Sequence, residues 1–148
     1  TEELTLEERV ILAENTTLWT AMGLTDEQKV SNLDQMGIPK RRLNCLLYQR
    51  SCDTFLGVPF NITSYALLTA MIAHCVGMEA GTFTHTYGDL HIYTNHIDQV
   101  NLQKAREARP LPKLWLNPDV KDLFSFKYDD VRLEGYDPHP TIKGAVAV

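Results

Sequence analysis

Residues 48–61 read YQRSCDTFLGVPFN and join the end of a predicted strand to the start of a predicted helix. The guanidinium of Arg50 offers a planar fork of donors that suits phosphate oxygens, and the hydroxyl of Ser51 adds another donor. The carboxamide of Asn61 donates and accepts at once, as reading the edge of a nucleobase requires. The same letters also fit a strand, a turn and a helix with Asn61 as its N-cap.

The elements around this stretch predict an α+β fold. Residues 43–50 are nearly apolar on both faces, which predicts a buried strand. Residues 61–77 are apolar almost all round, which predicts a fully covered helix. The sequence therefore predicts one long buried helix against a mixed sheet. Shorter elements follow: a bent strand at 82–93, a helix at 95–106, a strand at 113–116, a turn at 118–123, and short strands at Phe126, Val131 and Leu133.

Residues 1–42 predict a charged helical hairpin. Thr5-Leu6-Glu7-Glu8 is a capping box whose helix continues through Leu18 to Gly23, and residues 25–28 open a second helix that Gly37-Ile38-Pro39 ends. The hairpin contains no cysteine and no histidine. Lys40-Arg41-Arg42 follows it, either as a solvated corner or as a contact to a nucleotide phosphate or RNA.

Composition narrows the class of protein. The chain has 148 residues and a net charge of -5, which suits one globular domain and argues against a general polyanion-binding surface. Three cysteines without metal-ligand spacing predict free thiols in a reducing, cytoplasmic setting and no metal. We see no secretory segment and expect no apolar run long enough to span a bilayer.

From Leu43 onward, four blocks of the sequence resemble thymidylate synthase in their residues, their order and their spacing. The resemblance implies that residues 43–148 are the C-terminal part of a thymidylate synthase-like domain and that residues 1–42 are an insertion. It also implies a layered fold whose kinked sheet packs against that of an identical subunit in a homodimer. The blocks are LLYQRSCDTFLGVPFNITSYALL (46–68), GDLHIYTNHIDQVNLQ (88–103), REARPLPKL (106–114) and GYDPHPTIKGAVAV (135–148).

The reaction that this resemblance implies is the reductive methylation of dUMP to dTMP, with methylenetetrahydrofolate supplying both the carbon and the hydride. Arg50 and Ser51 would bind the phosphate of dUMP. Asn61 would pair with the uracil N3–H and O4, a pattern that cytosine reverses. His91 and Tyr93 would hold the ribose 3′-hydroxyl; the alternative for them is a satisfied pair inside the sheet.

The folate contacts are implied in the same way. Asp53 would accept hydrogen bonds from the pterin, unless it is only a turn aspartate. The tail 146–148, with Ala147, would fold over the ligands and exclude water, unless it is a frayed terminus. The flat rings of the folate would pack against Leu56, Gly57 and Phe60.

The nucleophile of the family is not identified in this sequence. The family's cysteine lies in a Pro-Pro-Cys-His motif on the strand just before the YQRS strand, and none of Cys45, Cys52 and Cys75 matches it. For Gln49 the resemblance implies a supporting role, which is to steady the nucleophile and the phosphate contacts. We therefore expect the thiol on a missing N-terminal part or a complementary chain.

Two other functions remain as alternatives. A dUMP hydroxymethylase would share Asn61 and much of the pocket, with water in place of hydride as the second reactant. A degenerate relative would bind a nucleotide or RNA without methylating it. One local departure from the family, Gly144-Ala145 in place of Ala-Pro, predicts a looser closing tail.

Overall fold

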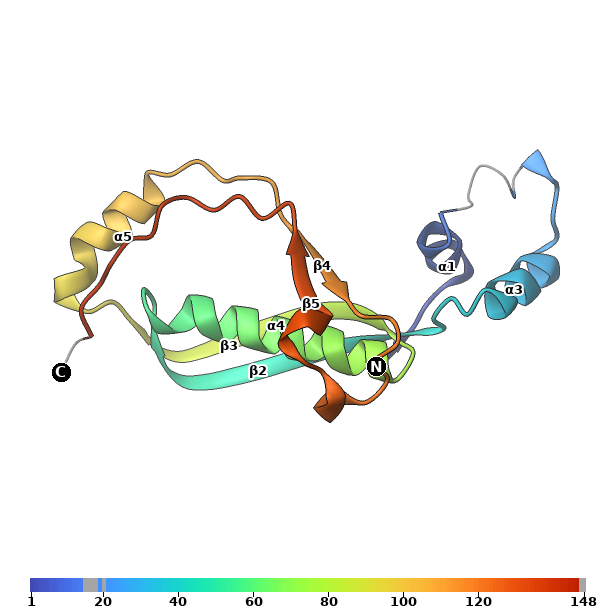
Figure 1. Ribbon diagram of the computed structural model, residues 1–148, viewed down its shortest axis with the longest axis horizontal. Coiled ribbons are helices and arrows are strands. Elements are labelled where there is room, and N and C mark those ends of the chain that lie inside the picture. The colour runs from blue at the N-terminus through green and yellow to red at the C-terminus, as the bar shows by residue number, and fades with distance from the viewer. Residues whose placement is uncertain (15–18, 20, 147–148) are drawn as a thin grey trace.

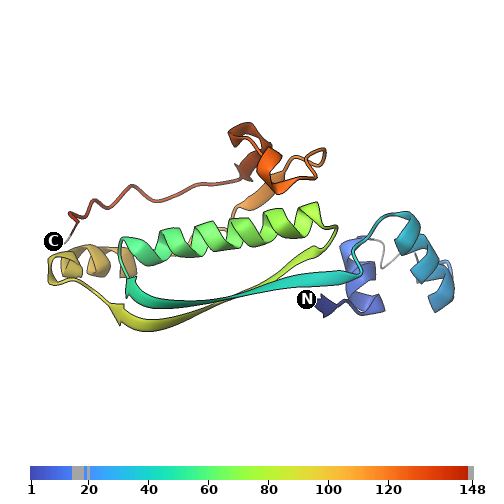
Figure 2. The same ribbon diagram turned by 90° about the horizontal axis from the view of Figure 1, so that it is seen from below.

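A computed structural model describes residues 1–14, 19 and 21–146, and its centre is one strand–helix–strand unit (Figures 1 and 2). Strand β2 (Arg41–Asp53) and strand β3 (Glu79–His91) run parallel, and helix α4 (Gly57–Cys75) connects them. Strand β1 (Glu2–Glu3) pairs antiparallel with the start of β2. The α+β class, the mixed sheet and the long helix packed on it are thus confirmed.

Further elements follow β3 in the sequence. A 3-10 turn, η1 (Thr94–His96), leads into helix α5 (Ile97–Lys104). Strands β4 (Lys113–Leu116) and β5 (Val131–Glu134) form a separate antiparallel pair, with the 3-10 turns η2 (Leu123–Ser125) and η3 (Tyr128–Asp130) between them. Figure 2 shows α4 lying between the β2–β3 pair and this second pair.

The prediction of a strand at Phe126 is wrong. Phe126 lies between η2 and η3, and its ring packs edge-on against His74 of α4 with centroids 6.0 Å apart. The Nε2 atom of His74 lies 2.9 Å from the carbonyl oxygen of Val120 in the same connection. The segment is therefore held by side-chain contacts to α4 in place of a strand ladder.

Helix α4 begins earlier than the sequence predicts, at Gly57 instead of Asn61. Pro59 lies inside its first turn, where a missing backbone N–H breaks no intrahelical bond, so this proline does not mark a boundary. Asn61 is consequently a residue of the helix, and the alternative that it is the N-cap is wrong. At the other end, Gly77 has φ +67°, the left-handed conformation that commonly follows a helix.

The expectation that α4 is covered on all sides is not met in the described structure. Its buried residues are Val58, Thr69 and Ala73, whereas Phe60 is 74% exposed. The β2–β3 pair covers one side, and the β4–β5 segment reaches only the C-terminal half. By length and composition α4 could also span a membrane, contrary to the expectation from sequence, but core helices of soluble proteins share this composition.

Strand β2 is likewise open on one face, so the prediction of burial on both faces is wrong for the described residues. Leu46 and Tyr48 are 72% and 63% exposed, while Leu47 on the opposite face is half-buried. The side-chain alternation of a strand places these two sets on opposite sides of the sheet. The register shifts between Leu43 and Cys45, which introduces an irregularity into the otherwise regular pairing with β3.

The N-terminal region contains helices α1 (Leu6–Leu12), opened by the predicted capping box, and α3 (Asp26–Gln35), opened by a second capping box at the predicted position. Thr5 and Glu8 bond reciprocally at the first, and Thr25 and Gln28 do so at the second. Helix α1 ends at Leu12, and Leu18, predicted on the same helix, lies outside the described residues. The small core of this region is Val10, Trp19 and Leu33.

An ionic network joins this region to the start of β2. The buried Arg9 donates to Asp34 Oδ1 at 2.7 Å and to the carbonyl oxygens of Ile38 and Pro39. Lys40 also bonds Asp34, at 2.7 Å, and Arg42 bonds Glu8 at 3.1 Å. The pairs fix the orientation of the two helices on the strand; the prediction that residues 1–42 are an insertion stays a prediction.

The network predicts a loss of stability in acid. Hydrogen bonds from Lys40 and Arg9 lower the pKa of Asp34, and bonds from the Thr5 backbone and side chain lower the pKa of Glu8. The folded chain therefore binds protons less readily than the unfolded chain, so stability is present above the unfolded pKa values and falls as the pH drops below roughly 4.5. Fluorescence of Trp19 in a Trp115→Phe background would report the transition.

The control for this prediction is Asp34→Asn, which removes one titrating group. The acid transition of the variant should be flatter than that of the parent, whatever its stability at neutral pH. Identical pH slopes for the two proteins would show that Asp34 is not a source of the acid sensitivity.

Candidate functional site

The carboxyl ends of β2 and β3 meet at one edge of the sheet, beside the start of α4. Ser51 pairs with Asp89 and Asp53 with His91 in the parallel register. Thr54 closes the corner, since its backbone N–H and its hydroxyl both donate to the His91 carbonyl oxygen, at 2.9 and 2.7 Å. Such an edge is the usual ligand position in open parallel sheets. The structure thus brings together the stretch 48–61 and the block 88–103.

Arg50 and Ser51 are both exposed at this edge. No ion pair engages the Arg50 guanidinium within the described ranges, so its donors are open to a ligand. The strands approach closely here, because a Cβ on Gly88 would lie 2.7 Å from the Arg50 carbonyl oxygen. Only glycine fits at position 88 without moving the strand that carries Arg50.

Gln49 and Asn61 contact each other directly. Gln49 Nε2 donates to Asn61 Oδ1 at 3.1 Å and to the Ser51 carbonyl oxygen at 3.0 Å. The Oε1 atom of Gln49 lies 2.9 Å from Nε2 of His85 on β3. The carboxamide of Gln49 is therefore engaged with protein groups on all sides, and its predicted part in steadying a nucleophile and the phosphate would act through Asn61 and Ser51.

Asp53 caps the turn before α4. Its Oδ1 accepts from the backbone N–H of Phe55 at 3.1 Å and, more weakly, from that of Leu56 at 3.4 Å. This is the turn-aspartate geometry, yet it uses one carboxylate oxygen and leaves Oδ2 without a partner in the described part of the chain. Gly57 lies beside it, with space for a Cβ 3.5 Å from that of Asp53.

His91 is the last residue of β3, and Tyr93 follows just beyond it, before η1. Their rings meet edge to face with centroids 5.0 Å apart. The Nδ1 atom of His91 lies 3.3 Å from the Asp89 carbonyl oxygen and 3.6 Å from its Oδ1. Tyr93 is 41% exposed.

The C-terminal tail returns to this end of the molecule, as Figure 1 shows. His96 Nε2 lies 2.7 Å from the Ala145 carbonyl oxygen, and Asn95 donates to the same oxygen at 3.3 Å. Gly144 fits tightly, since a Cβ there would lie 2.7 Å from a ring carbon of Phe55. The tail is thus anchored at Gly144-Ala145, the departure from the family from which the sequence predicts a looser tail. Ala147 and Val148 lie outside the described residues.

None of the three thiols is placed for nucleophilic attack. Cys52 is fully buried, and its Sγ lies 3.3 Å from the Gln49 carbonyl oxygen. Cys45 and Cys75 are half-buried away from the edge, on β2 and at the end of α4. A reactive thiolate needs a partly open, cationic setting, which Cys52 lacks.

The basic cluster 40–42 lies at the opposite end of β2. Arg42 is eight positions before Arg50, roughly 26 Å along a strand at about 3.3 Å per residue, so one nucleotide cannot reach both. Lys40 is paired with Asp34, Arg42 with Glu8, and Arg41 donates to Thr1 at 2.6 Å. The contacts favour the structural corner over a phosphate or RNA site.

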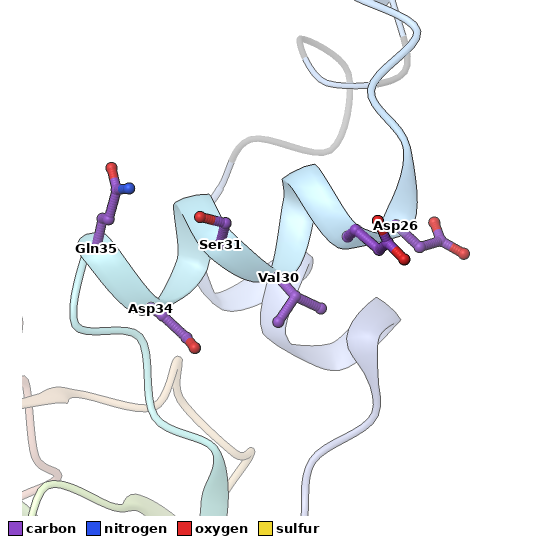
Figure 3. A pocket seen from close by; sticks show the side chains of 6 residues that line it. Asp26, Val30, Ser31, Asp34 and Gln35 are labelled. Carbon is purple, nitrogen blue, oxygen red and sulfur yellow. The ribbon is translucent and has the colours of Figure 1, made fainter.

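A shallow hollow on α3 is also remote from the predicted site. Its side chains come from successive turns of one helix (Figure 3). Asp34 is held by Arg9 and Lys40, and Asp26 by Lys29, so these two carboxylates already have cationic partners. The hollow is lined by Asp26, Glu27, Val30, Ser31, Asp34 and Gln35.

Sequence reasoning missed two histidines, His85 and His96. Alternation places His85 on the same face as Phe83 and Tyr87, which is the available signal, but its contact with Gln49 depends on the register between two strands. His96 lies in the block 88–103, and its partner is 49 residues further on. Local patterns do not reveal contacts at that separation.

One comparison with known proteins bears on these observations. The family model described as thymidylate synthase matches residues 18–148. The match covers the strand–helix–strand unit, the edge with Arg50, Asn61 and His91, and the tail. The chain belongs to the thymidylate synthase family.

Proposed function

We propose that this chain supplies the nucleotide- and folate-binding part of a thymidylate synthase, the methyltransferase that converts dUMP to dTMP with methylenetetrahydrofolate. The observation that carries the proposal is that one end of the strand–helix–strand unit holds an arginine without an ion pair among the described residues, a carboxamide oriented by Gln49, and a histidine–tyrosine pair. Arg50 and Ser51 bind the phosphate, Asn61 reads the uracil edge, and His91 with Tyr93 holds the ribose. The free cysteines suit a cytoplasmic enzyme.

The folate would lie beside the start of α4. Phe60 is 74% exposed there, and an exposed aromatic side chain suits packing against flat aromatic groups. The unpartnered oxygen of Asp53 can accept a hydrogen bond from a pterin N–H. When bound, the folate provides the one-carbon unit and the hydride, while Asp53, Leu56, Gly57 and Phe60 orient it and the tail with Ala147 covers it.

The nucleophilic thiol would come from a complementary strand. In the described structure β1 pairs with β2 only at Arg41 and Arg42, so the same edge of β2 is open from Leu43 onward. An open strand edge carries unpaired N–H and C=O groups that another strand can bond. A strand with a Pro-Pro-Cys-His motif that paired with this free side of β2 would lie next to the strand that carries Arg50.

The open face of the sheet supports a homodimer. Leu46 and Tyr48 project from it with most of their surface exposed, and Thr84 and Thr86 of β3 share this exposure. Burial of such a face against a second copy removes apolar area from water. We therefore propose that the complete assembly contains two copies of this chain.

Reconstitution tests the proposed function. The chain is mixed or co-expressed with a polypeptide that carries the Pro-Pro-Cys-His half, and dihydrofolate formation is followed by absorbance with dUMP and methylenetetrahydrofolate. We expect turnover from the pair and none from either part alone. Failure of a correctly assembled pair to form dTMP would contradict the proposal.

The products and the binding behaviour separate the alternatives. Hydroxymethyl-dUMP without dihydrofolate would identify a hydroxymethylase, in which water captures the intermediate. The buried Cys52 favours binding without turnover for this chain by itself. Tight dUMP binding by an inert reconstituted pair would identify a nucleotide-binding relative.

A further inference from the structure

Three side chains from three elements form a continuous hydrogen-bonded chain toward the nucleotide edge. His85 of β3 contacts Gln49 of β2 at 2.9 Å, and Gln49 contacts Asn61 of α4 at 3.1 Å. Gln49 also contacts the carbonyl oxygen of Ser51 at 3.0 Å. His85 lies two steps from Asn61 and is not a part of the predicted binding set.

The Ser51 carbonyl determines the direction of every bond in this chain. A carbonyl oxygen only accepts, so the Gln49 atom that faces it must be the amide nitrogen. The Gln49 oxygen then faces His85, and His85 must present an N–H at Nε2. The second hydrogen of the Gln49 amide faces Asn61, whose contacting atom must be its oxygen.

His85 is held in the orientation that this chain needs. Its ring lies between those of Phe83 and Tyr87, with centroids 5.6 and 4.2 Å away. Its Nδ1 atom is buried and has no hydrogen-bond partner within the described residues. In the neutral ring with a proton on Nε2, Nδ1 carries only a lone pair, the less costly state for an unpartnered buried atom.

We propose that His85 is a specificity-positioning residue: it fixes the amide of Gln49, which fixes the oxygen of Asn61 and hence its polarity toward a pyrimidine. This inference rests on the proposed function of Asn61 as the reader of uracil. Uracil presents an N3–H donor and an O4 acceptor, and cytosine presents the reverse. A carboxamide held in one orientation favours uracil, whereas one free to flip accepts either base.

The test compares dUMP and dCMP binding by titration calorimetry on the 148-residue chain. His85→Phe keeps a ring but removes the donor, and His85→Gln restores an N–H. We expect His85→Phe to lower the ratio of dUMP to dCMP affinity by about tenfold, the effect of one hydrogen bond, and His85→Gln to recover most of it. Tyr87→Phe is the matched control, because it changes the neighbouring ring and leaves the chain of bonds intact.

Two outcomes overturn the inference and are distinct from failure of the proposed function. An unchanged dUMP to dCMP ratio in His85→Phe, in a variant whose amide spectrum remains folded, removes the specificity role. A neutral His85 with its proton on Nδ1 and none on Nε2, read from nitrogen-15 correlation spectra of the unliganded protein, removes the chain of bonds itself. Absence of dUMP binding by the parent chain after reconstitution with the Pro-Pro-Cys-His half instead contradicts the proposed function, and with it any role in base selection.

Discussion

Replacing Arg50 with glutamine is expected to weaken dUMP binding by about 100-fold, the upper range for losing charge-assisted bonds to a phosphate. The guanidinium is exposed at the edge where β2 and β3 end, and none of the ion pairs of the described chain includes it. The variant should fold as the parent does, because the Arg50 side chain makes no hydrogen bond or ion pair with another described residue. Calorimetric titration with dUMP measures the change.

Arg132→Gln is the matched control for charge. Arg132 lies on β5, where its guanidinium packs over the Trp115 ring at 4.9 Å, remote in sequence and sheet from Arg50. The two variants lose the same charge, so a general electrostatic effect would weaken dUMP binding equally in both. Equal losses would therefore contradict the assignment of Arg50 as the phosphate ligand. An equal loss of affinity for deoxyuridine, which lacks the phosphate, and for dUMP in Arg50→Gln would contradict it as well.

Replacing His96 with alanine is expected to lower the free energy of unfolding by about 3 kcal/mol, as for a buried ring with one hydrogen bond. His96 is fully buried, contacts the rings of Phe55 and Tyr93, and holds the Ala145 carbonyl oxygen at 2.7 Å. Its loss removes packing at the edge and frees the tail. Urea denaturation followed by circular dichroism gives the change in stability.

His139→Ala is the control, because it deletes the same kind of side chain and a similar bond. His139 Nε2 contacts the Glu107 carbonyl oxygen at 2.9 Å, but the residue is only half-buried and the bond is exposed. The exposed bond should contribute less than about 1 kcal/mol. Comparable losses in both variants would show that burial of His96 adds nothing to the anchoring of the tail.

The local chemistry of the sequence predicted much of this fold. Thr5 opens a helix through the predicted capping box and Thr25 opens the second predicted helix, because such caps depend on residues three positions apart. The strand with YQRS and the following helix were also expected from local patterns. The start of α4 was misplaced because Pro59 is compatible with both a boundary and a first turn.

Burial and long-range pairing could not be obtained in the same way. The apolar character of Leu46, Tyr48 and Phe60 predicts burial, but it does not indicate which element covers these side chains, and in the described structure they are exposed. The bond between His85 and Gln49 follows from a strand register, and that between His96 and Ala145 from the path of the tail. Family resemblance located the edge residues, while the structure showed how their neighbours orient them.

The two tryptophans lie in different parts of the molecule, so their fluorescence can report on those parts separately. Trp19 is buried in the small core of the N-terminal helices, and Trp115 lies on β4 beneath Arg132 in the second sheet. Neither belongs to the β2–β3 edge, so each emission spectrum reports on its own part of the chain. Single-tryptophan variants would therefore resolve whether the N-terminal helices melt before the rest, without an introduced label.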